Sequence, residues 1–207
     1  MSIETEFKWR ATAAADFDKM LSAVRTLTGR ALPPVQILHI SDAYADTPDE
    51  ALSAQKIAMR VRCTDGAYEA TLKTKTRLEN GKAVRREETL PLPGAHTHRE
   101  ALAALRSRGT WQGVDVARLE FKFYIQNNRR VYTLAQAGAI YELALDEVEI
   151  TAGERRQNML EIELELKAGP AEDFCAWAQK LGEISGLKAP EYSKVATATA
   201  LWKGEIK

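Results

Sequence analysis

Charged and apolar residues alternate along several short segments of the chain. In "IETEFKW" (residues 3–9), Glu4, Glu6 and Lys8 occupy every second position, and the residues between them are mostly apolar. Because successive side chains of a β-strand point to opposite faces, this segment predicts a strand with one charged and one apolar face. The charged face either meets solvent, which is the commoner arrangement, or lines an enclosed site.

The alternation recurs in five more segments, and helical patterns lie between and after them. The further predicted strands are "AMRVRC" (58–63), "EATLKTK" (69–75), "AVRREETLPL" (83–92), "YELALDEVEI" (141–150) and "LEIELELK" (160–167). Apolar residues at helical spacing predict four helices, over residues 12–29, 97–109, 171–182 (after Pro170) and 193–203. Thr12 or Asp16 is the candidate cap of the first helix. No βαβ repeat and no linker is evident, so we expect a single mixed α+β domain over residues 1–207.

Charge is segregated among these strands. The first and last are rich in glutamate, whereas residues 58–63 and 69–75 carry arginine and lysine. Like charges at alternate positions of one face repel each other unless counter-charges or a ligand lie opposite. A closed antiparallel barrel explains the pattern, with ionic faces turned inward and apolar faces buried under helices. A water-filled lumen that holds both signs, a metal and an anion would lower the cost of enclosing charge.

The residue types in such a lumen indicate its chemistry. Guanidinium and ammonium groups suit an anion with several negative charges, and guanidinium matches phosphate oxygens bidentately. Clustered carboxylates are hard oxygen ligands for Mg²⁺ or Mn²⁺. Cations and a divalent metal around one cavity are typical of phosphoryl transfer.

Composition narrows the partners. The 207 residues include 29 basic and 29 acidic side chains, so no net field favours nucleic acid or an anionic membrane. No secretory or membrane-spanning segment is evident, and we expect a cytoplasmic protein. Cys63 and Cys175 lie far apart and give neither metal-ligand spacing nor a disulfide framework. The choice between monomer and homodimer stays open.

The ordered motifs resemble those of one family. "IETEFKW" resembles the E-x-E-x-K signature of the CYTH superfamily, the triphosphate tunnel metalloenzymes, and "YADTPDEALSAQKIAMRVR" (44–62) resembles its Y-x-D-T-P segment. The later strands and "EYSKVATATALW" (191–202) are similar to further motifs in the expected order. The resemblance implies an eight-stranded antiparallel β-barrel, or tunnel, with helices packed on its outside. It also implies metal-dependent hydrolysis of inorganic triphosphate (tripolyphosphate) to pyrophosphate and phosphate.

The resemblance further implies roles for individual residues. The metal ligands would be Glu4, Glu6, Asp146, Glu161 and Glu163. The phosphate-binding cations would be Lys8, Arg60, Arg62, Lys73, Lys75, Arg85 and one or both of Arg129 and Arg130. Glu4 or Glu163 would position or deprotonate water, Lys8 would be catalytic, and Lys194 would close over the substrate. Glu87, Glu142 and Glu165 would be supporting acids. Whether Arg85 or Arg86 faces the tunnel stays open.

Other activities are compatible with the same pattern. A class IV adenylate cyclase and a thiamine triphosphatase share the scaffold, and a polyphosphate-binding module without turnover would use the same cations. The glutamate-rich strands favour catalysis, because a pure anion binder would bind better without them. Asp42, Tyr44 and Asp46 are expected to shape a strand and its turn rather than take part in chemistry.

Overall fold

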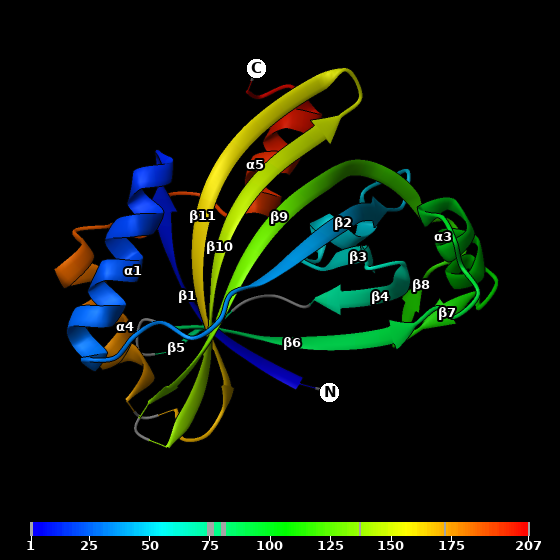
Figure 1. The fold of residues 1–207 in the computed structure, drawn as a ribbon. Coiled ribbons are helices and arrows are strands. Elements are labelled where there is room, and N and C mark those ends of the chain that lie inside the picture. The colour runs from blue at the N-terminus through cyan, green and yellow to red at the C-terminus, as the bar shows by residue number, and fades with distance from the viewer. Residues whose placement is uncertain (1, 74–76, 80–81, 137, 172, 207) are drawn as a thin grey trace.

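One antiparallel sheet that closes on itself forms most of the molecule (Figure 1). The computed structural model describes residues 2–73, 77–79, 82–136, 138–171 and 173–206, and the side chains of these except 2–4, 77–79 and 82–86. Around the ring the order is β1 (Ser2–Ala11), β11 (Arg155–Ala168), β10 (Ala139–Ala152), β9 (Glu120–Gln136), β2 (Gln36–Asp46), β3 (Ala58–Thr64), β4 (Ala67–Lys73) and β6 (Lys82–Pro91). β6 pairs again with β1, and β5 (Arg77–Glu79) is a ninth strand paired with β6. The predicted eight-stranded tunnel is confirmed.

The ring closes at β1, which divides its pairing between two neighbours. Residues 2–6 pair with β6, and residues 6–11 pair with β11. Glu6 is the position that belongs to both pairings. It therefore lies at the seam of the tunnel, where the first strand passes from one neighbour to the other.

The register places the charged positions of successive strands on one face. Cross-strand partners share a face of a sheet, and Lys8 pairs with Glu163, which pairs with Ala144. Across β10 and β9, Asp146 pairs with Glu161 on one side and with Arg129 on the other. These positions line the inside of the ring, so the alternation in the sequence separates lumen from exterior.

Two groups of helices cover the outer face. α1 (Ala14–Thr28) and α4 (Phe174–Ser185) pack over β1 and β9–β11. α3 (His98–Arg106) covers β3 and β4, where Leu105 and Met59 are fully buried. α4 begins at Phe174 rather than directly after Pro170, and it continues past the predicted end at Gly182 to Ser185. The short α2 (Ala51–Ala54) and the β7 (Thr110–Trp111) and β8 (Val114–Asp115) hairpin were not predicted.

The last helix, α5 (Lys194–Lys203), differs from the predicted outer placement. Its Ala198 and Leu201 pack against Phe123, Val148 and Ile150. Val148 and Ile150 share the inner face with Asp146, since side chains two apart on a strand point the same way. The inner face becomes apolar at this end, and α5 covers it there, behind β9–β11 in Figure 1. α5 thus packs inside the curved sheet and brings its first residue into the tunnel.

The start of α1 shows how a sequence signal sets a boundary. Asp16, one of the two candidate caps, accepts hydrogen bonds from the backbone nitrogens of Thr12 at 2.8 Å and Ala13 at 3.3 Å. Ala13 is the N-cap, so Asp16, the third residue of the helix, binds back to the backbone that precedes α1, as the N3 side chain of a capping box does. In the described part of the chain, no helix combines the length and apolar character needed to cross a membrane.

Candidate active site and metal centre

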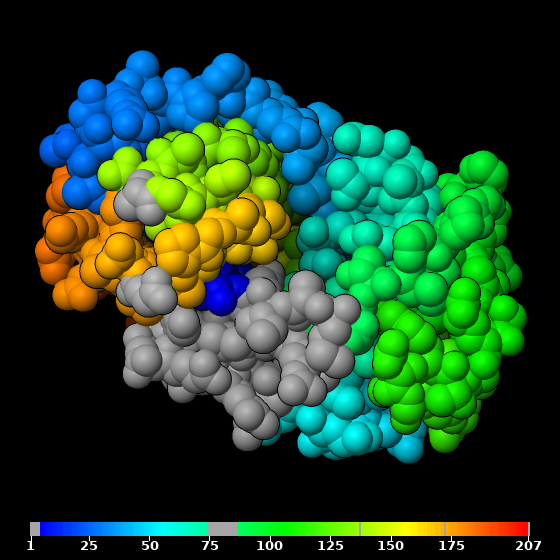
Figure 2. Space-filling view, turned by 90° about the horizontal axis from the view of Figure 1, so that it is seen from below, coloured from blue at the N-terminus to red at the C-terminus, as the bar shows by residue number. Residues whose placement is uncertain are grey.

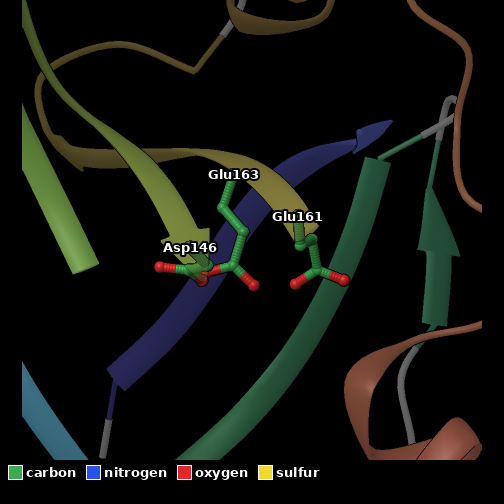
Figure 3. A group of neighbouring side chains, drawn as sticks. All are labelled: Asp146, Glu161 and Glu163. Atoms are coloured by element: carbon green, nitrogen blue, oxygen red, sulfur yellow. The ribbon is translucent and has the colours of Figure 1, made fainter. Parts of the chain in front are cut away.

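Three carboxylates from adjacent strands converge inside the tunnel. Asp146 projects from β10, and Glu161 and Glu163 project from β11, with one oxygen of each lying within 4.8 Å of the others (Figure 3). Asp146 and Glu161 are completely buried, and Glu163 nearly so. The Oε1 atom of Glu161 is buried and has no hydrogen-bond partner among the described residues. An orphaned acceptor is costly, and this set of hard oxygen donors fits Mg²⁺ or Mn²⁺.

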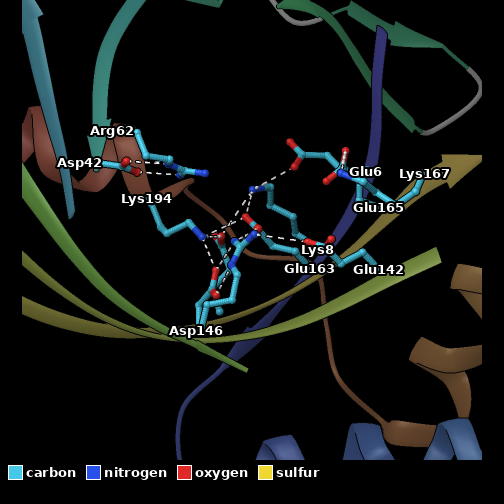
Figure 4. A network of polar contacts seen from close by, with 12 residues as sticks. Glu6, Lys8, Asp42, Arg62, Glu142, Asp146, Glu163, Glu165, Lys167 and Lys194 are labelled. Atoms are coloured by element: carbon cyan, nitrogen blue, oxygen red, sulfur yellow. Dashed lines mark hydrogen bonds and ion pairs between the residues drawn. The ribbon is translucent and has the colours of Figure 1, made fainter. Parts of the chain in front are cut away.

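Two lysines approach these carboxylates from different elements (Figure 4). Lys194, the first residue of α5, places Nζ 2.9 Å from Glu161 Oε2 and 3.0 Å from Glu163 Oε1, and it also contacts Asp146. Lys8 of β1 contacts Glu163 and lies 3.4 Å from Glu161 Oε2. The carboxylates are thus held together by cations from both ends of the chain.

Arg129 completes this side of the site. It donates to Asp146 through Nε at 2.8 Å and through Nη2 at 2.7 Å, and Nη2 also contacts Glu163. Its Nη1 lies 3.8 Å from Glu142 Oε1, nearer the rim. A bidentate guanidinium–carboxylate pair fixes both side chains in one plane.

The acidic groups of this cluster differ in their proton affinity. Burial raises the pKa of Glu161 to about 7, although Lys194 and Lys8 oppose the shift. For Glu163, burial alone would raise the pKa, but Lys194, Lys8 and Arg129 together hold it well below the usual range. Asp146 has a lowered pKa for the same reason. The neighbouring cations therefore favour the ionised form of Asp146 and Glu163 more strongly than that of Glu161.

The opposite side of the lumen is rich in guanidinium groups. Arg62 donates to Asp42 through Nε at 2.7 Å and through Nη2 at 2.8 Å. Arg60 donates to Thr71 Oγ1 at 3.2 Å, and its Nε lies 3.9 Å from Asp42 Oδ1. This Nε is buried, and no described side chain forms a hydrogen bond with it. We call β1, β10 and β11 with their acids the carboxylate wall, and β2, β3 and β4 with these arginines the guanidinium wall. On the guanidinium wall, Lys73 also forms an ion pair with Glu87 of β6.

Most of the sequence-predicted residues meet in this lumen. Those whose side chains the structure places there are Glu6, Lys8, Arg60, Arg62, Lys73, Glu87, Arg129, Asp146, Glu161, Glu163 and Lys194, with Glu142 and Glu165 nearer the rim. Glu6 Oε2 lies 3.3 Å from Lys8 Nζ. Seen from below, the first strand is visible in a hollow between β9–β11 and β3–β4 (Figure 2).

Arg130 does not belong to the site. Its Nη2 lies 3.5 Å from Glu147 on the outer face, and its guanidinium lies 5.0 Å from the ring centre of Phe17 in α1. The reason is strand parity, because Arg129 is in register with Asp146 and Arg130 with Leu145. Of the two arginines that the sequence left open, Arg129 faces the tunnel.

Three predicted residues lie outside what the structure describes. Lys75 falls on undescribed residues, and the side chains of Glu4 and Arg85 are also not described. The backbone register pairs Glu4 with Arg85 and Ile3 with Arg86. The roles of Glu4, Lys75 and Arg85 stay predictions.

Asp42 is the site residue that the sequence reading assigned to strand and turn shape alone. Asp46 does shape the turn, accepting from the backbone nitrogens of Leu52 and Ser53, both at 2.9 Å. Asp42, four residues earlier on the same face, instead binds Arg62 in the lumen. The sequence does show that Asp42 lies four positions before Asp46 and so on the same face of the strand. It does not show that Asp42 pairs with Arg62, because that depends on the register between β2 and β3.

Comparison with known proteins gives a family and a fold. The CYTH domain model matches residues 2–198. The inorganic triphosphatase of Haemophilus influenzae is 32% identical over 146 residues, which cover 70% of this chain and 41% of that protein. The chain thus spans less than half the length of this curated relative.

Solved structures match along nearly the whole chain. A candidate adenylyl cyclase from Hippeastrum, described as having a dominant triphosphatase activity, gives a TM-score of 0.65 at 19% identity, covering 95% of each chain. A candidate adenylate cyclase from Bacillus halodurans gives 0.60 at 18%, covering 94% of this chain and 97% of that one. The mimivirus capping enzyme triphosphatase gives 0.52 at 12%, covering 92% and 90%. At such identities these matches show a shared fold.

Proposed function

Because this chain belongs to the CYTH domain family, we propose that it hydrolyses inorganic triphosphate to pyrophosphate and phosphate inside the tunnel, with a divalent metal. The observation that carries the proposal is the pair of unlike walls: three buried carboxylates face a lumen whose other side holds Arg60 and Arg62. The curated relative named as an inorganic triphosphatase supports this substrate.

In this proposal the carboxylate wall holds the metal. Asp146, Glu161 and Glu163 would bind Mg²⁺ or Mn²⁺, with Glu6 and Glu4 as further ligands from β1. When bound, the ion would neutralise charge on the phosphoryl oxygens and polarise them. Glu163, whose pKa is held low, would stay ionised and orient the attacking water.

The guanidinium wall would bind the substrate. Arg60 and Arg62 would donate to phosphate oxygens, and Lys73 would add a further positive charge, with Lys75 and Arg85 as predicted contributors. Arg129, on β9 between the two walls, would donate to the phosphate chain from beside the carboxylates. Lys8 and Lys194 lie on the boundary between the carboxylates and the open lumen. They would stabilise the negative charge that develops on the bridging oxygen as the phosphoanhydride bond breaks.

The test measures products from three substrates. Purified protein is given inorganic triphosphate, ATP or thiamine triphosphate with Mg²⁺, Mn²⁺ or EDTA, and phosphate and cyclic AMP are measured. We expect phosphate release that requires metal and is fastest with inorganic triphosphate. Cyclic AMP from ATP would instead assign a cyclase, and preference for thiamine triphosphate would assign that activity. Binding of triphosphate without turnover would assign a binding module.

Two adjacent arginines provide a matched pair for this assay. Arg129→Gln removes a tunnel cation, whereas Arg130→Gln removes the same group from the outer face. Loss of a charged donor at a phosphoryl-transfer site typically costs about 100-fold or more in turnover. We expect this loss for Arg129→Gln and near-wild-type turnover for Arg130→Gln. Equal effects would contradict a reaction inside the tunnel.

A further inference from the structure

Asp42 is a carboxylate placed among the cations of the guanidinium wall. It lies within β2, is only 5% exposed, and faces Arg62 across the β2–β3 register. It accepts two hydrogen bonds from Arg62 and lies 3.9 Å from Arg60 Nε. The negative charge of Asp42 would by itself weaken the binding of a polyanion at this wall. We therefore asked whether Asp42 has another effect that favours binding.

The contacts of Asp42 fix the orientation of Arg62. The two bonds engage Nε and Nη2, the edge of the guanidinium group that also suits bidentate binding of an anion. Among the residues described, Nη1 of Arg62 has no hydrogen-bond partner. The side chain is thereby held in one plane with a single donor nitrogen uncommitted, which avoids the rotamer entropy that a mobile arginine loses on binding.

The neighbouring arginine is held by a related arrangement. Arg60 donates Nη2 to Thr71, which is completely buried on β4, and its Nε is directed toward Asp42 at a distance too long for a hydrogen bond. Arg60, Arg62 and Lys194 hold the pKa of Asp42 below its usual value despite burial, which by itself would raise it. Asp42 is therefore an ionised anchor shared by cations from β3.

We infer that Asp42 is a positioning residue for substrate binding, which orients Arg62, and through charge Arg60, toward the phosphate chain. This inference rests on the proposed function for the identity of the ligand. By orienting the arginines, Asp42 would raise the affinity for the phosphate chain by more than its negative charge lowers it. The two effects have opposite signs, since a carboxylate that merely added charge would weaken the binding of a polyanion.

The experiment measures affinity for inorganic triphosphate by calorimetry, in EDTA and again with Mn²⁺. Asp42→Asn makes the wall more positive by one charge but removes the anchor. Asp42→Glu keeps the charge and displaces the carboxylate by one methylene. We expect both variants to bind about ten-fold more weakly, the lower end of what the loss of one hydrogen bond to a charged group costs. Tighter binding by Asp42→Asn, or wild-type affinity for Asp42→Glu, would overturn the inference.

A double-mutant cycle identifies the partner through which Asp42 acts. Arg62→Lys keeps the positive charge but cannot form the bidentate pair. In that background Asp42→Asn should change the affinity by less than about two-fold, because the interaction is already lost. Additive effects of the two changes would show that Asp42 does not act through Arg62.

Two further measurements keep the result interpretable. Thermal melting establishes that each variant is folded, and Thr71→Val, which changes no charge, probes the other anchor if Asp42→Asn does not fold. Weaker binding by Thr71→Val would then support the inference that held arginines bind the phosphate chain, and unchanged binding would contradict it. A wild-type protein that binds triphosphate without hydrolysing it would refute the proposed function and leave the inference on Asp42 standing. No binding with or without Mn²⁺ would refute both.

Discussion

The two walls of the tunnel use the same kinds of side chain in opposite proportions. On the carboxylate wall a cation is surrounded by acids, as Lys194 is by Asp146, Glu161 and Glu163. On the guanidinium wall one acid, Asp42, lies between Arg60 and Arg62. The first arrangement leaves carboxylate oxygens in excess and the second leaves N–H donors in excess. The carboxylate wall is therefore suited to a cation, which the guanidinium wall repels, and the guanidinium wall is suited to an anion, which the carboxylate wall repels.

This difference explains how a chain with 29 basic and 29 acidic residues can still present a locally positive surface on one side of the tunnel. The relevant potential is local and is set by which strands are neighbours. β10, β11 and β1 are consecutive in the ring, as are β2, β3 and β4. Strand order therefore gathers charges of each sign that are scattered along the sequence.

Removing an acid from the carboxylate wall should have the largest effect. Glu163→Gln is expected to abolish measurable Mn²⁺ binding and to lower triphosphate turnover by about 10³-fold, because under the proposed function Glu163 is both a metal ligand and part of the charge network. Metal titration by electron paramagnetic resonance and phosphate release measure the two losses. Glu149→Gln, which changes a half-exposed acid of β10 whose Oε1 lies 3.9 Å from Arg156, is the control. Retained metal binding in Glu163→Gln would show that the wall is not a metal site.

A change in the guanidinium wall should separate substrate binding from metal binding. Arg60→Gln is expected to raise the KM for triphosphate by about 10-fold to 100-fold, because a charge-assisted donor is lost, and to leave Mn²⁺ affinity without substrate unchanged. Steady-state kinetics and metal titration of the same preparation check this. Equal weakening of metal and triphosphate binding would mean that the two walls do not act separately.

A substitution that weakens the packing of α5 should lower the free energy of unfolding and so affect both walls indirectly. Leu201 is completely buried against the inner face, and Leu201→Ala is expected to cost about 2–4 kcal/mol of unfolding free energy. Urea denaturation followed by circular dichroism gives this value. Lys203→Gln, on an exposed position of the same helix, should change it by less than about 0.5 kcal/mol. A stability loss below that level for Leu201→Ala would contradict the packing of α5 inside the sheet.

The smallest effect is expected outside the tunnel, at the start of α1. Lys19 and Thr12 hold the pKa of Asp16 below its usual range. Asp16→Asn should therefore cost about 1 kcal/mol at neutral pH. Because the native pKa is the lower one, this stabilisation is present above the unfolded-state pKa of about 4 and is lost as the pH falls below it. Urea titrations at pH 7 and pH 3 should show the difference between variant and wild type narrowing. A constant difference would exclude a charge effect.

Much of the tunnel could be predicted from the sequence because alternation is a local property. The inward parity of Glu6, Lys8, Arg62 and Glu161 follows from their apolar neighbours, and the CYTH-like motifs imply an eight-stranded antiparallel barrel. "NNRRVY" gave no parity because its four polar residues are consecutive. Its orientation is set by pairing with β10, which puts Arg129 beside Asp146.

The missed features depend on contacts between distant segments. The pairing of Asp42 with Arg62 joins two strands whose register no short motif encodes. The inner placement of α5 depends on apolar residues at the far ends of β9 and β10, which in the sequence are indistinguishable from an outer face. Both features depend on the curvature of the sheet, and that curvature is fixed only when the ring of strands is closed.

The seam at β1 has a consequence for the order in which this protein can be assembled. Lys8 and Glu163 are 155 positions apart, yet they lie on paired strands and form an ion pair. During synthesis, residues 7–11 of β1 have no partner strand until β11 has left the ribosome. Closing such long loops is slow and leaves strand edges exposed in the meantime. The step that joins the ends of the ring should therefore limit the rate of folding, and activity should return only with that step after dilution from denaturant.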